Sequence, residues 1–578
     1  MSMRARLAKV TRALGGAVDA QIAIRGGSVI DGTGAPARRA DVGVADGRVV
    51  EIAERVTAPR EIDATGRIVT PGFVDIHTHY DPQVLWDPSL SPSCWHGVTS
   101  VVAGNCGYSI APTRPADRAS LLRTLDKVED MRLATLEAGV EWDFETYGEY
   151  LDVVARRGTV INFGGYVGHT PVRLYVMGDD AYERKATDEE ISRMKQVVAD
   201  SLNGGALGFS SDRGGFHIGD GGRPVPSIMA SQEETEALMR VTGEINRGMI
   251  HIAPGENYEW VYDFQKSLGR TITWSSILTY PPEWKSRAPF KGKLDRHTAG
   301  RRDGADVWVQ VTCRPIVQQI LMNEPTPFYQ LPAFADLVAT PMADRPTLYR
   351  DPAWRKRVYD EFESSKWINP GWETFTVADS QAHPDLEGRS LASIARDRGC
   401  TPFDALSDIA LDDDLMARFE VTFANNDEAG ITLLVQSEGC IMGLSDAGAH
   451  ISQICDAVMP TDFLSSWVRD REVMPIERGV RKLTGEIADV IGVDRGYIRV
   501  GSPADIVVLD LEQLSPGPLR RVRDMPAAGE RLVADAPTGI DAVLVNGAPI
   551  RLDGKPIDHL LEELPGAVLR SAPAKARS

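Results

Sequence analysis

Short apolar runs of strand length alternate with longer amphipathic segments along most of the chain. The runs lie at residues 98–104, 160–166, 206–210, 248–252, 271–275, 307–311 and 440–446, and helical periodicity between them is clearest at 188–202 and 231–247. Such an alternation predicts a parallel sheet covered by helices. About seven or eight units over roughly 400 residues favour an α/β fold of the closed (β/α)8 type, a TIM-like barrel, over an open sheet.

Shorter alternating runs near both chain ends predict a second, smaller β-structure. Residues 42–44 and 48–52 flank an Asp-Gly turn, which is typical of a β-hairpin. Residues 498–510 and 541–547 again have strand character. Because residues 21–66 alone are too few to bury much apolar surface, we expect both chain ends to build one small β-sandwich together.

The chain is therefore expected to have four parts. Residues 1–20 form a helical N-terminal extension, 21–66 and 491–578 supply the two parts of the β-sandwich, and 67–490 form the barrel. The last part also includes a C-terminal tail. At about 320–430 the alternation is interrupted by a segment rich in proline, tryptophan and charge, which predicts a helical insertion over the barrel mouth.

Composition narrows the class of protein. Hydrophobic residues make up 43% and charged residues 25%, as in ordinary globular proteins, and the formal net charge of −19 argues against a nucleic-acid partner. Six cysteines in 578 residues are too few for a disulfide scaffold, and no apolar run reaches the roughly 18 residues of a membrane span. We expect a cytoplasmic protein with no membrane partner, and a homo-oligomer is compatible with the sequence.

Two histidines separated by one residue are the most informative chemical feature. His77 and His79 end the apolar stretch 68–76, so both imidazoles point to the same side of a strand, about 7 Å apart along the backbone. Imidazole is a good ligand for zinc and related metals, whereas a lone histidine is more commonly a packing residue. The pair, with Asp75 two residues before it, predicts a metal site.

Polar side chains also close the other predicted strands, at the edge where a parallel barrel performs its chemistry. They are Cys106, His169, Ser210, Ser211, His251, Ser275, Ser276, Arg314 and Asp446. Histidines scattered through a core would not be expected to fall at successive strand ends. His96, in contrast, is expected on a helix or loop surface.

These motifs resemble the metal-dependent amidohydrolase superfamily. Residues 71–79 (PGFVDIHTH) and, much later, 445–450 (SDAGAH) carry the resemblance. Residues 104–107 (GNCG) and 168–173 (GHTPVR) narrow it to the D-aminoacylase branch, the N-acyl-D-amino-acid deacylases. The resemblance covers nearly the whole chain and implies a barrel that hydrolyses amide bonds with bound zinc.

When the metal ligands of the family are assigned to the matching positions of this sequence, the resemblance implies that His77, His79 and Asp446 are ligands of one metal site. Cys106 stands where many relatives have a carboxylated lysine, and His251 stands at the ligand position of the fifth strand. Thiolate and imidazole ligands favour Zn²⁺ over Mg²⁺, with one or two ions per chain. For Cys106 the alternative is a small buried apolar residue, which is what most free cysteines are.

The sixth strand departs from the family pattern. D-aminoacylases have a histidine at its end, where this chain has Ser275 and Ser276. Serine hydroxyls do not belong to the usual zinc ligands. The number of metal ions and the range of substrates therefore stay open.

Asp446 has a second role in the superfamily, as the catalytic residue. A bound metal lets water ionise near neutral pH, and a carboxylate beside it can accept the water proton and pass it to the leaving nitrogen. The alternative is a helix N-cap, because Asp446 precedes a run of small residues.

Five further residues are candidates for binding the substrate. Arg213 and Arg314 could hold a substrate carboxylate through two guanidinium nitrogens each. His169 could orient the substrate or fix a strand-end turn, His450 could hold Asp446 through a hydrogen bond, and Tyr280 could line the pocket. For each of them the alternative is an ordinary surface or packing residue.

The sequence thus predicts a zinc-dependent hydrolase of a non-peptide C–N bond, acting on an N-acyl amino acid or a related acylated amine. A first alternative is hydrolysis of a cyclic amide, or of a specialised natural product, at the same site. A less favoured alternative is a binding protein that has lost turnover, because the chain retains all five expected metal ligands. Metal analysis separates the alternatives, since only the enzyme needs its zinc for activity.

Overall fold

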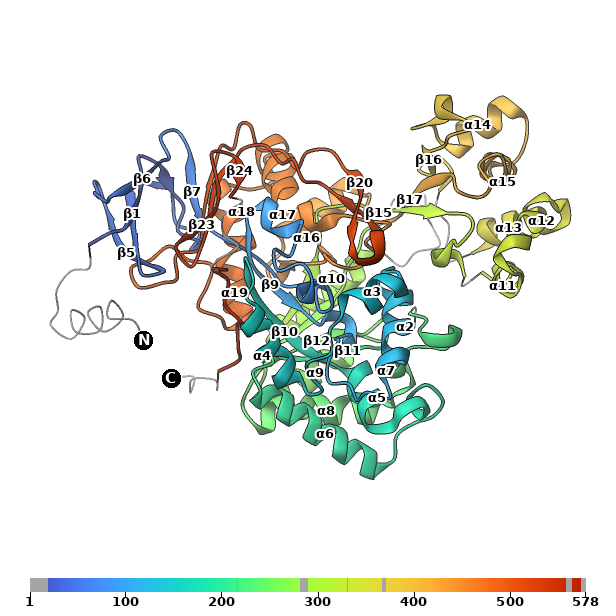
Figure 1. Ribbon diagram of the computed structural model, residues 1–578, viewed down its shortest axis with the longest axis horizontal. Helices are drawn as coiled ribbons and strands as arrows, with labels where there is room; N and C mark the ends of the chain where they lie inside the picture. Colours follow the sequence, from blue (N-terminus) through green and yellow to red (C-terminus); the bar gives the residue numbers. More distant parts are fainter. Residues whose placement is uncertain are drawn as a thin grey trace.

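The chain folds into a central barrel with a β-structure on one side and a separate lobe on the other (Figure 1). The computed structural model describes residues 19–215, 217–280, 289–329, 331–365, 371–557 and 564–572. The N-terminal extension expected at residues 1–20 lies almost wholly outside the described residues.

Eight parallel strands make up the barrel sheet, in the order β18-β14-β13-β12-β11-β10-β9-β8. A parallel bridge between Thr78 and Ala447 joins the two outermost strands just beyond their ends, so the sheet is nearly closed. The predicted (β/α)8 barrel is confirmed. The strands are β8 (Phe73–Asp75), β9 (Val98–Ala103), β10 (Asn162–Gly168), β11 (Gly208–Asp212), β12 (Met249–Ala253), β13 (Ile272–Ser275), β14 (Val307–Val311) and β18 (Cys440–Met442).

Amphipathic helices cover the outside of the barrel. The two predicted most clearly are α6 (Asp188–Asn203) and α8 (Gln232–Glu244), which begin after the N-cap residues Thr187 and Ser231. Their apolar faces pack against the sheet because the strands are buried on both sides. The others are α2 (Arg118–Val128), α3 (Leu133–Gly139), α4 (Tyr147–Arg157), α5 (His169–Met177), α7 (Pro226–Met229), α9 (Trp260–Leu268), α10 (Phe290–Arg302), α16 (Glu428–Gln436), α17 (Met459–Asp462), α18 (Ile476–Leu483) and α19 (Gly485–Ile491).

Segments from both chain ends meet in one sheet beside the barrel, as the sequence predicted. β7 (Ile68–Pro71) pairs with β19 (Ile506–Leu509) in antiparallel register, Thr70 opposite Val507, and Figure 1 shows the blue and red segments side by side. This seven-stranded sheet has the order β24-β23-β22-β19-β7-β2-β3 and shares a hydrophobic core with the four-stranded sheet β5-β4-β1-β6. The remaining strands are β1 (Ile22–Arg25), β2 (Ser28–Val29), β3 (Arg38–Arg39), β4 (Asp41–Ala45), β5 (Arg48–Ala53), β6 (Arg60–Asp63), β22 (Ile540–Val545), β23 (Ala548–Leu552) and β24 (Lys555–Pro556).

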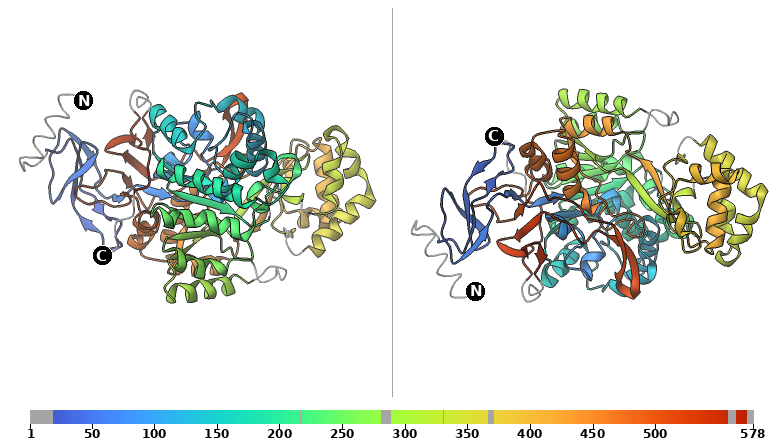
Figure 2. Two further views of the ribbon diagram at one scale, coloured as in Figure 1. Left: turned by 90° about the horizontal axis from the view of Figure 1, so that it is seen from below. Right: turned by 90° about the horizontal axis from the view of Figure 1, so that it is seen from above.

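The segment after β14 forms a lobe with a hydrophobic core of its own. A three-stranded antiparallel sheet, in the order β15-β17-β16, forms its base, and helices pack on it. All three views show the lobe projecting away from the barrel (Figures 1 and 2). Its elements are β15 (Ile316–Leu321), α11 (Phe334–Ala339), α12 (Arg345–Arg350), α13 (Pro352–Ser364), β16 (Thr376–Asp379), α14 (Leu391–Arg398), α15 (Pro402–Asp412) and β17 (Arg418–Ala424).

The expected surface position of His96 is wrong, because this side chain is completely buried. Its Nδ1 lies 2.9 Å from the Thr461 hydroxyl and its Nε2 lies 2.7 Å from the carbonyl oxygen of Ala534. Burial lowers the pKa of His96 to about 4. Ala534 directly follows the hairpin of β20 (Arg520–Met525) and β21 (Gly529–Val533), and local sequence near residue 96 could not reveal this distant cover.

All six cysteines lie in the described residues, and each is a free thiol. None of the described helices combines the length and the apolar character that a bilayer span requires. The longest barrel helix, α6, has 16 residues, several of them charged.

Candidate metal centre

The two histidines of the His-x-His motif lie just beyond the end of β8, in the barrel interior. Their rings are buried, with centroids 5.4 Å apart. Asp75 fixes the turn before them, since one carboxylate oxygen accepts the His77 backbone N–H at 3.1 Å and the other accepts the Ser445 hydroxyl at 2.6 Å. Asp75 therefore connects the first and last strands of the barrel.

Cys106 approaches these histidines from the turn after β9. Its Sγ lies 3.5 Å from His77 Nε2, and ligand atoms of His77, His79 and Cys106 all lie within 4.8 Å of one another. Ligands of one tetrahedral zinc ion at about 2.0 Å and 2.3 Å would lie about 3.5 Å apart, so this spacing suits a shared metal. Cys106 has φ of 53°, a left-handed conformation that non-glycine residues seldom adopt without a functional reason.

Asp446 brings a carboxylate to the same place from the segment after β18. Its Oδ1 lies 3.0 Å from His77 Nε2 and 3.8 Å from His79 Nε2. This residue also has a left-handed backbone, with φ of 44°. Such a conformation is unlike that of an ordinary helix N-cap, which is usually extended. The predicted alternative for Asp446 is therefore not supported by its backbone.

His251, on β12, completes the cluster. Its side chain is fully buried, and its Nε2 has no hydrogen-bond partner among the described residues. Burial lowers the pKa of His251, so the ring is neutral and the Nε2 lone pair can bind a metal. A buried imidazole nitrogen without a partner is costly unless something else occupies that place. The residues present thus fit a metal ion.

The electrostatics of the cluster lead to the same conclusion. Burial opposes the imidazolium form of His77, but the Cys106 thiolate and the Asp446 carboxylate outweigh it and raise the His77 pKa to about 10. Burial likewise opposes ionisation of Cys106 and Asp446, yet the facing histidines hold the pKa of each well below its usual range. Two buried anions therefore require positive charge between them. A divalent cation would supply it and release the protons.

The sequence analysis missed two residues that contact the metal-site histidines. The buried Glu129, just after α2, has Oε1 3.0 Å from His79 Nδ1. Gln310, on β14, has Oε1 2.5 Å from His77 Nδ1. Glu129 directly follows a helix, where a glutamate is usually exposed to solvent, so its sequence position gave no indication of a contact with the metal site. Gln310 could have been noticed, because an uncharged polar residue between Val309 and Val311 is unusual in a buried strand.

The residues predicted to bind substrate lie around the barrel rim, and three of them already have polar partners. His169 Nδ1 lies 2.9 Å from the Ser211 hydroxyl, and its Nε2 lies 3.1 Å from Glu234. Arg213 donates to the Ala230 carbonyl and the Thr235 hydroxyl, and Arg314 pairs with Asp456 and Asp462. None of these contacts tests a role in substrate binding.

The other two candidates are Tyr280 and His450. Tyr280 is half-buried beyond β13 and ends a described range, and His450 is half-buried four residues after Asp446. The side chain of Asp446 contacts His77 and His79, whereas His450 lies near the carboxyl of Asp130, whose pKa is raised by burial. The five substrate-binding assignments stay predictions.

A histidine–carboxylate pair next to the Cys106 turn was also missed. Asp212, at the end of β11, accepts from the Tyr108 hydroxyl at 3.3 Å and lies 2.6 Å from His217 Nδ1. Burial opposes the charged form of His217, but Asp212 outweighs it and raises the His217 pKa to about 9. The rim of the barrel therefore carries a fixed cation at neutral pH.

Because the folded state raises the pKa of His217 above 6.5, the pair should stabilise the fold below pH 6.5 and lose this contribution as the pH rises through about 9. The difference in melting temperature between the wild type and His217→Asn should accordingly be largest near pH 6 and smallest near pH 10. Thermal unfolding at a series of pH values measures it. In an Asp212→Asn background the same comparison should show a smaller difference near pH 6, and a constant difference in the wild-type background would contradict the assignment.

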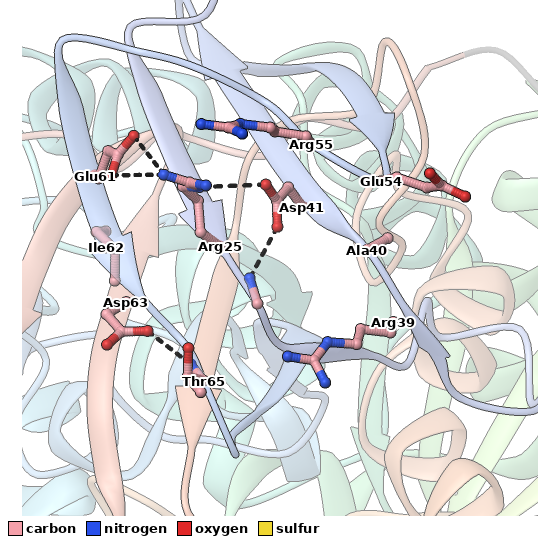
Figure 3. A pocket seen from close by; sticks show the side chains of 11 residues that line it. Arg25, Arg39, Ala40, Asp41, Glu54, Arg55, Glu61, Ile62, Asp63 and Thr65 are labelled. Carbon is pink, nitrogen blue, oxygen red and sulfur yellow. Dashed lines mark hydrogen bonds and ion pairs between the residues drawn. The ribbon is translucent and has the colours of Figure 1, made fainter.

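A cavity of about 770 Å³ lies elsewhere, in the N-terminal β-strands. Its lining comes only from residues 25–65, and Figure 3 shows Arg25 paired with two of the carboxylates there. Arg25 pairs with Glu61 and Asp41, and Asp63 accepts from Thr65. No barrel strand contributes to this cavity, so its size does not mark the site of chemistry.

Comparisons with known proteins agree with this geometry. A model of the amidohydrolase family matches residues 60–551. The N-acyl-D-glutamate deacylase of Alcaligenes xylosoxydans xylosoxydans is 30% identical over 570 residues, covering 95% of this chain and 96% of that protein. The D-aminoacylase of the same organism is 27% identical over 543 residues, covering 91% and 93%.

The chain is also similar to solved structures of such deacylases. N-acyl-D-glutamate deacylase from Bordetella bronchiseptica, complexed with zinc and a phosphonate mimic of the tetrahedral intermediate, is 27% identical to this chain. Its TM-score is 0.65, and the match covers 96% of this chain and 100% of that one. A crystal structure of D-aminoacylase, 24% identical with a TM-score of 0.66, covers 95% of this chain and 100% of that one and has the same fold.

Proposed function

Since the chain belongs to the amidohydrolase family, we propose that it is a zinc-dependent hydrolase of non-peptide C–N bonds whose substrate is an N-acyl amino acid. The relatives named above include deacylases of N-acyl-D-amino acids, and they match this chain over almost its whole length. A D-configured substrate is the form we favour on this basis.

One observation carries the proposal: five potential ligands from four separate strand ends converge on one buried place. His77, His79, Cys106, His251 and Asp446 are the residues that would hold the zinc. Sulfur and imidazole donors with a single carboxylate suit zinc better than magnesium or calcium, which prefer oxygen. A binding protein without turnover would have no reason to keep this set buried and charged.

Asp446 is the residue that we propose moves the proton. When bound, zinc acts as a Lewis acid that lowers the pKa of water and polarises the scissile carbonyl. The carboxylate of Asp446 is ionised, because His77 and His79 hold its pKa low against the effect of burial. It can therefore accept a proton from the attacking water and return it to the leaving nitrogen as the C–N bond breaks. His217 and Asp212 lie at the rim, where an anionic substrate would pass.

The test is a hydrolysis assay with a matched substrate panel. N-acetyl-D- and N-acetyl-L-glutamate, -leucine and -aspartate, together with a hydantoin and an aryl amide, should be offered to zinc-loaded and chelator-treated protein. Release of free amino acid only by the zinc-loaded protein supports the proposal. Turnover of the hydantoin in preference to all acyl amino acids would instead favour the cyclic-amide alternative, and activity indifferent to chelation would exclude the metal mechanism.

The proposed division of the chain rests on its separate hydrophobic cores. A separate cluster fills the lobe, which supports an insertion at about 320–430, and another fills the β-sandwich, while the barrel cluster also takes in residues after 490. We further propose a cytoplasmic protein, in keeping with six unpaired thiols. Sedimentation analysis would establish whether it forms a homo-oligomer.

A further inference from the structure

We propose that Gln310 is a positioning residue that fixes the ring tautomer of His77, and that Thr273 holds the Gln310 amide in the orientation this requires. This inference rests on the proposed function only in assuming that the cluster binds zinc. Both side chains are fully buried, and they come from adjacent strands, β14 and β13.

The geometry at His77 defines one half of the arrangement. Its Nδ1 lies 2.5 Å from Gln310 Oε1, an oxygen that can only accept a hydrogen bond. The proton must therefore reside on Nδ1, which leaves the Nε2 lone pair directed at Cys106 and Asp446. With the Gln310 amide reversed, its NH₂ group would force the proton onto Nε2, where it would oppose metal binding.

Thr273 holds the Gln310 amide in this orientation. The amide NH₂ lies 3.4 Å from the Thr273 hydroxyl, which donates to the carbonyl oxygen of Ile250 at 3.5 Å, so the hydroxyl oxygen can accept from the amide. His251 Nδ1 lies 3.3 Å from both the Thr273 hydroxyl and the Gln310 NH₂ group. Because the NH₂ group can only donate whereas the hydroxyl can also accept, these two contacts do not fix the tautomer of His251.

Packing holds the glutamine amide in place. Gly443, just after β18, lies so close that a Cβ atom added there would be 3.0 Å from Gln310 Oε1. The rings of His77 and His251 contact each other edge to face, with centroids 5.1 Å apart. The amide oxygen thus faces His77, while the NH₂ group contacts Thr273 and His251. The sixth strand contributes the Thr273 hydroxyl to this network.

Zinc affinity of purified protein tests the inference without any substrate. Loss of a group that orients a metal ligand typically weakens metal binding about 10–100-fold. Gln310→Leu removes both contacts and should show a loss of this size in competition with a chromophoric chelator. Thr273→Val, which preserves shape, should show a smaller loss, because it removes only a contact that holds the Gln310 amide. Gln310→Glu keeps an acceptor for His77 and should retain more affinity than Gln310→Leu.

The control is Gln265→Leu, because Gln265 is also a buried glutamine that joins two backbone groups, but on α9 outside the barrel interior. It should lower the melting temperature while leaving zinc affinity unchanged. Cobalt-substituted protein gives a second readout, since displaced imidazoles alter the visible spectrum. Zinc affinity within twofold of wild type in both Gln310→Leu and Thr273→Val, with an unchanged cobalt spectrum, would overturn the proposal. If Gln310→Leu does not fold, Thr273→Val decides alone.

Discussion

Replacing Asp446 with asparagine should lower kcat for an N-acyl amino acid by about 10²–10⁴, the range that general acid–base groups contribute. Asparagine keeps the size and a carbonyl oxygen of the side chain, so the fold and much of the zinc binding should survive. It cannot accept the proton of the attacking water. Because the pKa of Asp446 is held low by His77 and His79, the wild-type carboxylate is ready for this role over a wide pH range.

Three measurements make this result specific. Zinc content and melting temperature should be close to wild type in Asp446→Asn, which separates lost chemistry from lost metal. Asp505→Asn is a matched control, because Asp505 is another buried carboxylate, but it lies just before β19 and pairs with Arg495. It should keep most of its kcat. Near-normal turnover by zinc-loaded Asp446→Asn would assign the proton transfer to another group.

The barrel could be predicted because its strands are local in sequence. Each is a short apolar run bounded by polar residues, and parallel order follows from the helices between them. The same logic placed His77, Cys106, His251 and Asp446 at strand ends, and the structure brings them together. The carboxyl ends of all barrel strands meet at one rim, however long the segments that connect the strands. Residues far apart in the sequence could therefore be assigned to one site.

The network behind the ligands could not be predicted in this way. Glu129 reaches His79 from a helix end, and its role depends on how α2 packs rather than on any local pattern. Gln310 stands inside a strand, where alternation shows only that it faces inward. His96 is buried by a hairpin more than 400 residues later in the chain. Such contacts are set by tertiary packing, which a single sequence does not specify.

Cys106→Ser should weaken zinc binding about 100-fold and leave the protein largely inactive at stoichiometric zinc. Structural zinc sites with four ligands bind with about 10–16 kcal/mol, so removal of one ligand would cost about 3 kcal/mol, or about 100-fold in affinity. The thiolate is also one of the two anions that require a cation at this place. A serine hydroxyl stays neutral there, so both the coordinate bond and the charge are lost.

Cys440→Ser separates this effect from the loss of a buried thiol. Cys440 is fully buried on β18, where burial raises its pKa to about 12, so it is a neutral packing residue. Its replacement should lower the melting temperature and leave zinc affinity unchanged. Competition titration with a chromophoric chelator measures both variants. If Cys106→Ser binds zinc as tightly as the wild type, Cys106 is the small buried apolar residue of the alternative interpretation, and the ion would be held by His77, His79, His251 and Asp446 alone.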